Sequence, residues 1–387
     1  MPSRARPFRL RSRWLPLLGA LFLVPALARP EDTPPAEQPA PAAPAEEPAP
    51  SPPAPVEVTS FVDVYYGYNL NKPAGDAPLR NFDTRHNAFS INLAEVALEK
   101  KVATESRVGF RMDLDFGPAS EMVAAFEPSD AGQDVFKHFQ QGYLSVLAGS
   151  KLQLDVGKFV TPHGAEVIES KDNWNYSRSL LFALAIPYYH VGLRATLPVN
   201  DKLTLAGYAV NGWNNSTENN SGKTFGLQAT VKPSGKLTWI AAVMAGPEQA
   251  DNTDDNRFLF DTTLSLAVGP KLSLMANYDY GSDKIAGADV SWSGVALYAK
   301  LQATESWALV PRFEFLDDDD GFMTGTSQKV KEFTVTSEHK IAGALLARIE
   351  YRVDFSDQPF FTKSDGSSRK SQSTLGVGFI YVIGGKI

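Results

Sequence analysis

The chain of 387 residues contains no cysteine and only five histidines. The absence of cysteine excludes disulfide bonds, thiolate metal sites and thiol nucleophiles. The histidines are scattered, and the sequence has no GxSxG, HExxH or P-loop pattern, which would mark a nucleophile, a zinc site or a phosphate-binding loop. We therefore expect no catalytic site, no metal site and no cofactor.

Positive charge is also in short supply. The chain has 37 Lys and Arg residues and 44 Asp and Glu residues, which gives a formal charge of −7 and a pI near 5.4. No patch of clustered Lys and Arg in the body of the chain offsets this acidic balance, so nucleic acid is excluded as a partner.

A long apolar run is missing even at the N-terminus. Residues 14–27 are mainly apolar but are interrupted by Pro16 and Pro25, and they fall short of the roughly 20 residues that a spanning helix needs. Five arginines precede them, and the small-residue pattern Ala26-Leu27-Ala28 follows. These features are typical of a signal peptide over residues 1–28. Its removal would change the charge to −7 − 5 = −12.

Residues 29–57 are rich in Pro, Ala and Glu and lack the apolar side chains that build a core. Such a tract favours an extended, polyproline-like linker of roughly 3.1 Å per residue. We expect a disordered linker here. It would be either a passive leader or a spacer that contacts the cell wall.

From Thr59 onward, apolar and polar residues alternate with a period of two, which is typical of strands with one apolar and one polar face. We expect an all-β domain over residues 58–387. The predicted strands are 59–70, 86–102, 105–117, 138–148, 150–160, 187–199, 201–213, 222–233, 235–247, 257–269, 271–282, 289–303, 305–316, 328–340, 342–356 and 371–384.

The connections between these strands alternate between tight turns and longer loops. The longer loops are expected at 71–85, 118–137, 161–186, 214–221, 248–256, 283–288, 317–327 and 357–370. Bacterial outer-membrane barrels have this pattern, with short periplasmic turns and longer external loops. The sequence therefore predicts a transmembrane antiparallel β-barrel of about 16 strands.

The charged face of each strand must meet water. In residues 344–355, Arg348 and Arg352 lie opposite an apolar face. At the bilayer midplane these two side chains would together cost up to roughly 4–8 kcal/mol. A soluble sandwich would also solvate them. However, the aromatic residues near strand ends fit the interfacial girdles of a barrel: Tyr66, Tyr68, Trp213, Tyr280, Trp292, Trp307, Phe315, Phe355 and Tyr381. We expect irregular pairing between Leu93 and Val96 and at Pro311.

The segments GKFVTPHGAEV (157–167) and DNWNYSRSLLFALAIPYYHVGLR (172–194) resemble those of the OmpL-like group of outer-membrane β-barrel porins. FVDVYYGYNLN (61–71) and RVGFRMDLDFG (107–117) are similar to the first strands of that family. The resemblance runs from about Ser60 to the C-terminus. It implies a barrel of the porin class without specifying a solute. The chain departs from the usual aromatic end of such barrels, because it ends at Ile387.

The loop 161–186 is long and charged, and its length would allow it to fold into the lumen. We predict that it forms a constriction through Glu166, Glu169, Asp172 and Arg178, and that these charges act as a selectivity ring. The alternative is an external loop on the rim. The predicted pore-lining residues are Arg111, Asp113, Asp155, Arg194, Arg312, Glu314, Arg348, Glu350 and Arg352.

The expected function is passive diffusion of small hydrophilic solutes or ions through a charged aqueous pore in the outer membrane of a Gram-negative bacterium. The acidic excess leans towards cations. The expected partners are outer-membrane lipid and lipopolysaccharide, the barrel-assembly machinery and the solutes, and a homo-oligomer is an open option. Two alternatives remain: a structural or tethering barrel without conductance, and a barrel lipid hydrolase built on His163 or His190.

Overall fold

The computed structural model describes residues 55–125, 127 and 133–384. The expected signal peptide and nearly all of the Pro-rich tract lie outside this range. The first strand begins at Glu57, the last residue of that tract. Among the described residues, no helix is long and apolar enough to cross a membrane.

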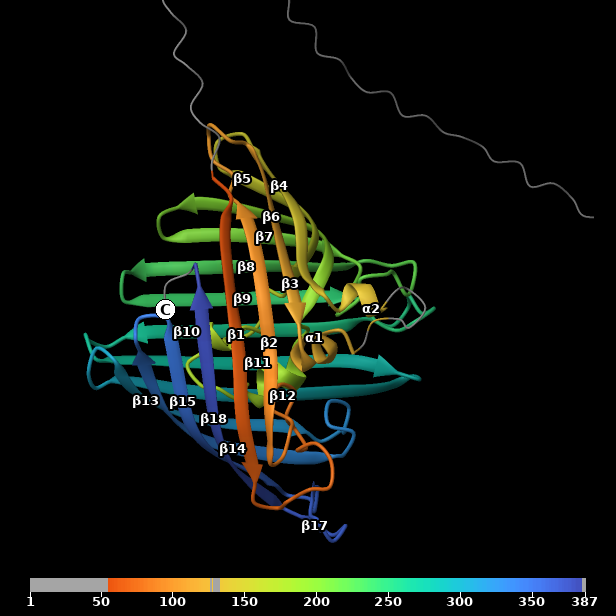
Figure 1. The fold of residues 1–387 in the computed structure, drawn as a ribbon. Coiled ribbons are helices and arrows are strands. Elements are labelled where there is room, and N and C mark those ends of the chain that lie inside the picture. The colour runs from red at the N-terminus through yellow and green to blue at the C-terminus, as the bar shows by residue number, and fades with distance from the viewer. Residues whose placement is uncertain (1–54, 126, 128–132, 385–387) are drawn as a thin grey trace, which may run out of the picture. The chain divides into compact units, whose positions relative to one another are not determined.

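Within the described residues, sixteen strands close into one antiparallel barrel, in which each strand pairs with its neighbours in the chain and the last pairs with the first (Figure 1). The strands are β1 (Glu57–Asn69), β2 (Ala88–Lys100), β3 (Val108–Phe116), β4 (Phe139–Ala148), β5 (Leu152–Val160), β6 (Tyr189–Asn200), β7 (Leu203–Val210), β8 (Thr224–Ser234), β9 (Leu237–Gly246), β10 (Arg257–Ala267), β11 (Leu272–Ile285), β12 (Ala288–Gln302), β13 (Trp307–Asp318), β14 (Gln328–Ile341), β15 (Leu345–Ser356) and β18 (Ser371–Ile383). The predicted fold class and strand number are confirmed.

Short elements lie in the longer loops. Between β3 and β4 are the helices α1 (Pro118–Val123) and α2 (Gln133–Phe136). Between β5 and β6 are the 3₁₀-helix η1 (Ser170–Asp172) and the π-helix η2 (Leu181–Ala185). The strands β16 (Phe361–Thr362) and β17 (Ser368–Arg369) form a small hairpin. Each is too short to leave a helical or strand period in the sequence.

The alternation of the sequence sets the two faces of the wall. On β15, Ile349 and Phe355 are about half exposed, whereas Arg348 and Arg352 are 1% exposed. The same division runs through β3, where Val108 and Phe116 are exposed and Asp113 and Asp115 are buried. Apolar side chains therefore face outward, where lipid would lie, and the charges face inward.

Two irregularities in pairing lie where the pattern of the sequence is broken. Leu93 pairs with Asp63 and Ile91 pairs with Val64, so Asn92 is the extra residue of a β-bulge. The bulge lies just before the predicted interval between Leu93 and Val96. The ladder between β12 and β13 is interrupted beside Pro311, which has no N–H to donate.

Two details of the prediction are wrong. The predicted loop at 283–288 is a tight turn of Ala286 and Gly287, both of which have positive φ. Ala gives no sequence signal for such a turn, which favours Asn or Gly. Trp213 and Trp292 do not belong to a girdle. They are buried inside the barrel with their ring centroids 6.2 Å apart.

Candidate functional site

The loop of residues 161–186, called the inward loop below, connects β5 to β6 and lies inside the barrel. Near its start, the Pro162 carbonyl accepts a hydrogen bond from Gln228 Nε2 on β8 (2.7 Å). Further on it contacts β13 and β15. In the ring of sixteen strands β13 lies opposite β5, so the loop reaches across the lumen.

Three wall arginines hold the inward loop. Arg312 Nη1 on β13 donates to the Ser177 carbonyl at 2.7 Å. On β15, Arg348 Nη1 donates to the Ser170 carbonyl at 2.6 Å, and Arg352 Nη1 donates to the Arg178 carbonyl at 2.7 Å. A guanidinium group presents five donors, so it can satisfy several backbone carbonyls that have no strand partner.

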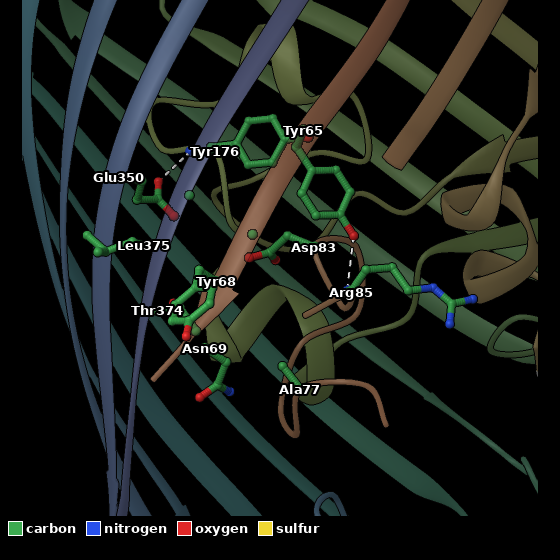
Figure 2. A pocket seen from close by; sticks show the side chains of 12 residues that line it. Tyr65, Tyr68, Asn69, Ala77, Asp83, Arg85, Tyr176, Glu350, Thr374 and Leu375 are labelled. Atoms are coloured by element: carbon green, nitrogen blue, oxygen red, sulfur yellow. Dashed lines mark hydrogen bonds between the residues drawn. The ribbon is translucent and has the colours of Figure 1, made fainter. Parts of the chain in front are cut away.

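Carboxylate groups of the wall also hold the inward loop, as hydrogen-bond acceptors. Glu350 on β15 accepts the backbone N–H groups of Tyr176 at 2.7 Å and Ser177 at 3.1 Å. Figure 2 shows Glu350 facing Tyr176, with Tyr65 and Asp83 beside them. The cavity in this view measures about 20 Å³, which is room for about one water molecule.

Asp63 is a further anchor that was not predicted. Its carboxylate accepts the hydroxyl groups of Ser170 and Tyr176, both at 2.7 Å, and it also accepts the amide of Asn92 at 2.7 Å. Asp63 is the only acidic residue in the apolar and aromatic segment FVDVYYGY. That isolated inward-facing charge was the available signal.

Most of the predicted constriction charges are buried within the loop rather than exposed to the lumen. Glu166 accepts from Arg312 Nη1 at 2.9 Å and from the Ser179 N–H at 2.7 Å. Glu169 accepts from Gln140 on β4, and Arg178 stacks on the Phe82 ring at 4.7 Å.

Asp172 differs from these buried charges. Its side chain is 56% exposed, and it pairs with Lys171.

The predicted pore-lining residues divide into two groups. Arg312, Glu314, Arg348, Glu350 and Arg352 are buried between the wall and the inward loop.

The second group, Arg111, Asp113, Asp155 and Arg194, forms two ion pairs on β3, β5 and β6. Arg111 Nε lies 2.9 Å from Asp113, with the two side chains 31% and 0% exposed. Arg194 Nε lies 2.8 Å from Asp155, with exposures of 19% and 1%. In both pairs the cation is the accessible partner.

The two histidines of the hydrolase alternative lie where the loop meets the wall. Nε2 of His190 is 3.1 Å from Thr161 Oγ1, and Nδ1 is 2.8 Å from the Gly212 carbonyl oxygen. His163 is buried, and its ring nitrogens have no hydrogen-bond partner among the described residues. Over the same part of the chain, no group of three or more His, Asp or Glu could hold a metal ion.

A closed barrel with an apolar outer face, a charged interior and a long loop folded into the lumen defines the class of outer-membrane porins. The model of the family β-barrel porin-2, OmpL-like, matches residues 55–383 of this chain, so the chain belongs to that family. This match confirms the resemblance seen in the sequence. The protein is thus an outer-membrane porin of Gram-negative bacteria.

Solved structures with a similar fold are porins and channels. The anion-selective porin from Comamonas acidovorans aligns with a TM-score of 0.59 and 11% identity, over 85% of this chain and 99% of that one. The channel DcaP of Acinetobacter baumannii gives 0.57 and 13%, over 86% and 98%. The trimer form of OmpT from Vibrio cholerae gives 0.56 and 13%, over 86% and 100%. No curated protein sequence matches.

Proposed function

We propose that the protein allows passive diffusion of small hydrophilic solutes, and that the inward loop sets the size limit. The observation that carries this proposal is the position of the loop. It starts beside β5, is hydrogen-bonded to Arg312 on β13 and returns to β6. Because it crosses from β5 to β13 and returns, the loop narrows the lumen at the level that it crosses.

The constriction is fixed rather than a gate. Hydrogen bonds that involve a charged group contribute about 1.5–3 kcal/mol each, and the loop makes several of these to Arg312, Arg348 and Glu350. Withdrawal of the loop would break these hydrogen bonds together with the buried ion pair between Arg312 and Glu166. Their combined loss opposes that motion.

The accessible charges favour a weak preference for anions among small ions. Arg111 and Arg194 expose their guanidinium groups and cover Asp113 and Asp155. Lys300 similarly covers Glu338, with side chains 22% and 4% exposed. The net charge of the chain predicts a preference for cations. We give more weight to the accessible charges of the wall, because a passing ion does not meet the buried ones, and the exposed Asp172 of the inward loop is paired with Lys171.

A second function is favoured by the density of packing around the loop. Wall residues that are not among the anchors of the loop, such as Leu259, Asp279 and Glu95, are also nearly inaccessible. A barrel filled at this level would be a structural protein without conductance. We rank it second because the protein belongs to a porin family.

We further propose that residues 1–28 direct export, that residues 29–57 form a linker, and that the barrel-assembly machinery inserts the barrel of residues 58–387 into a lipopolysaccharide-containing membrane. The protein would act without catalysis, as expected for a member of a porin family. It would assemble as a homo-oligomer. OmpT of Vibrio cholerae, which has the same fold, is described in a trimer form.

Liposome swelling tests the proposal. Vesicles that contain the folded protein are diluted into isotonic solutions of neutral sugars of increasing size. We expect rapid swelling with small sugars and a sharp fall in rate as size increases. Equal, slow rates for every sugar, matching protein-free vesicles, would favour the structural barrel.

A further inference from the structure

A cavity of about 530 Å³ lies on the external side of the inward loop. Small-molecule sites typically measure about 300–1,000 Å³. The inward loop contributes one wall through Leu184 and Ile186, and the external loops that follow β7, β9 and β13 contribute the others. A solute that enters from outside reaches this external cavity before it reaches the constriction.

The apolar part of the lining is accessible. Met122, Leu184, Phe322 and Met323 are each half-buried and line the cavity. Phe322 is held in place by the Arg257 guanidinium, which lies 5.3 Å from its ring centroid and 4.8 Å from that of Trp213. These side chains form a firm surface of the kind that packs against the C–H face of a sugar ring.

The polar part of the lining consists mainly of amides. Five of the ten residues in 211–220 are asparagine. Asn214, in the left-handed region with φ 54, accepts the Tyr188 N–H at 2.7 Å, which orders the segment. Asn81 Nδ2 donates to the Tyr188 hydroxyl at 2.6 Å, and its Oδ1 has no hydrogen-bond partner among the described residues.

Asn215 points most directly to a ligand. It is only 5% exposed and lines the cavity, yet its side-chain amide makes no hydrogen bond within the described part of the chain. Its amide atoms are not among the fully enclosed unpaired atoms, so they are open to the cavity, where a bound solute can reach them. A solute hydroxyl can both accept from the Asn215 N–H and donate to its oxygen.

The charges decide which solute fits. Arg257 is already neutralised by Asp283, at 2.8 Å, and the Glu248 carboxyl group lies in the same lining. An anionic solute would meet these carboxylates, whereas a neutral polyol would use the amides. We infer that the external cavity is a binding site for a neutral polyhydroxyl solute such as a monosaccharide or disaccharide. This inference rests on the proposed diffusion function and names its solute class.

Titration calorimetry of the folded full-length protein, in a detergent without a sugar head group, tests the inference with maltose as the probe. We expect saturable binding that Asn215→Ala or Phe322→Ala weakens roughly tenfold, the size expected for about 1.4 kcal/mol of lost contact. Asn252→Ala is the matched control, because Asn252 lies in an external loop and pairs with Asp255 outside the cavity. It should leave the affinity unchanged.

Three results would overturn the inference: no saturable heat from protein shown to be folded by circular dichroism, maltose binding that is indifferent to both variants, or tighter binding of glutarate than of maltose. Calorimetry does not require an open pore, so the two proposals can fail separately. Maltose binding without conductance would keep the site and remove the diffusion function. If vesicles swell in maltose but maltose binding does not depend on Asn215 or Phe322, the diffusion function stands and the binding site is removed.

Discussion

Arg312 of the wall and Glu166 of the inward loop lie 2.9 Å apart, and their side chains are 0% and 2% exposed. Arg312 also lies 3.1 Å from both Glu314 and Glu332. One cation therefore serves three buried carboxylates, and it joins the loop to the far wall. The position of the constriction depends on this residue more than on any exposed charge.

Replacing Arg312 by Leu should destabilise the barrel by about 3–5 kcal/mol, because it leaves buried carboxylates without their cation. The temperature at which the β-sheet circular dichroism is lost should fall, and channel current should become noisier as the loop loosens. Arg85→Leu removes an arginine whose side chain is 56% exposed and pairs with the exposed Asp76, and it is the control. Equal losses of stability in the two variants would argue against the anchoring role.

The double change Arg111→Gln and Arg194→Gln should shift selectivity towards cations without unfolding the barrel, since Asp113 keeps its hydrogen bond from Gln141 and Asp155 keeps those from Ser145 and Gln153. The reversal potential under a salt gradient measures this shift. Lys363→Gln, in an external loop where Lys363 pairs with Asp365, should leave the potential unchanged. An unaltered potential in the double variant would show that these arginines lie off the ion path.

The stability of the folded protein should depend on pH through Glu248. Burial raises its pKa from 4.5 to about 7, although it accepts hydrogen bonds from Thr224 Oγ1 and the Trp213 N–H. Because the folded-state pKa is the higher one, the stabilisation is complete below pH 4.5 and is lost as the pH rises through about 7. A rise in the pKa from 4.5 to about 7 corresponds to on the order of 3 kcal/mol.

Thermal unfolding of the wild type and of Glu248→Gln, followed from pH 4.5 to 8.5, tests this linkage. The neutral amide cannot ionise, so the wild type should lose more stability than the variant across that range. Other groups titrate in both proteins, and only the difference between the two curves is diagnostic. Parallel curves would contradict a raised pKa at Glu248.

Gly157 and Gly192 face each other on β5 and β6. Gly157 has φ +140, and a Cβ there would lie 2.2 Å from the Gly142 carbonyl oxygen. Gly157→Ala should therefore destabilise the barrel by roughly 1–3 kcal/mol. Gly142→Ala is a close control, because its Cβ would meet nothing within 4 Å. A melting temperature equal to wild type in Gly157→Ala would refute the close approach.

The barrel itself was predictable because its signal is local. Period-two alternation located all sixteen strands, and the broken alternation near Leu93 and the missing N–H of Pro311 located irregular pairing. The turn at Ala286 and Gly287 was missed because Ala is an unusual residue for positive φ. The inward position of Trp213 and Trp292 was missed because strand-end aromatics fit a girdle equally well.

The candidate site was predictable only in part. The charges of residues 161–186 marked the loop, but the pairing of Arg312 with Glu166 joins residues 146 apart in the sequence. No local pattern shows which of the inward arginines meets solvent and which meets the loop. Asn215, Phe322 and Glu248 come from three separate loops, so the external cavity exists only in the folded barrel.

The most direct test of the account is single-channel recording of the folded protein in a planar bilayer under a potassium chloride gradient. We predict stable conductance steps of uniform size, since the inward loop is fixed. We also predict a reversal potential whose sign shows that chloride permeates better than potassium. Silence from protein that is folded by circular dichroism would contradict the diffusion function and favour the structural barrel.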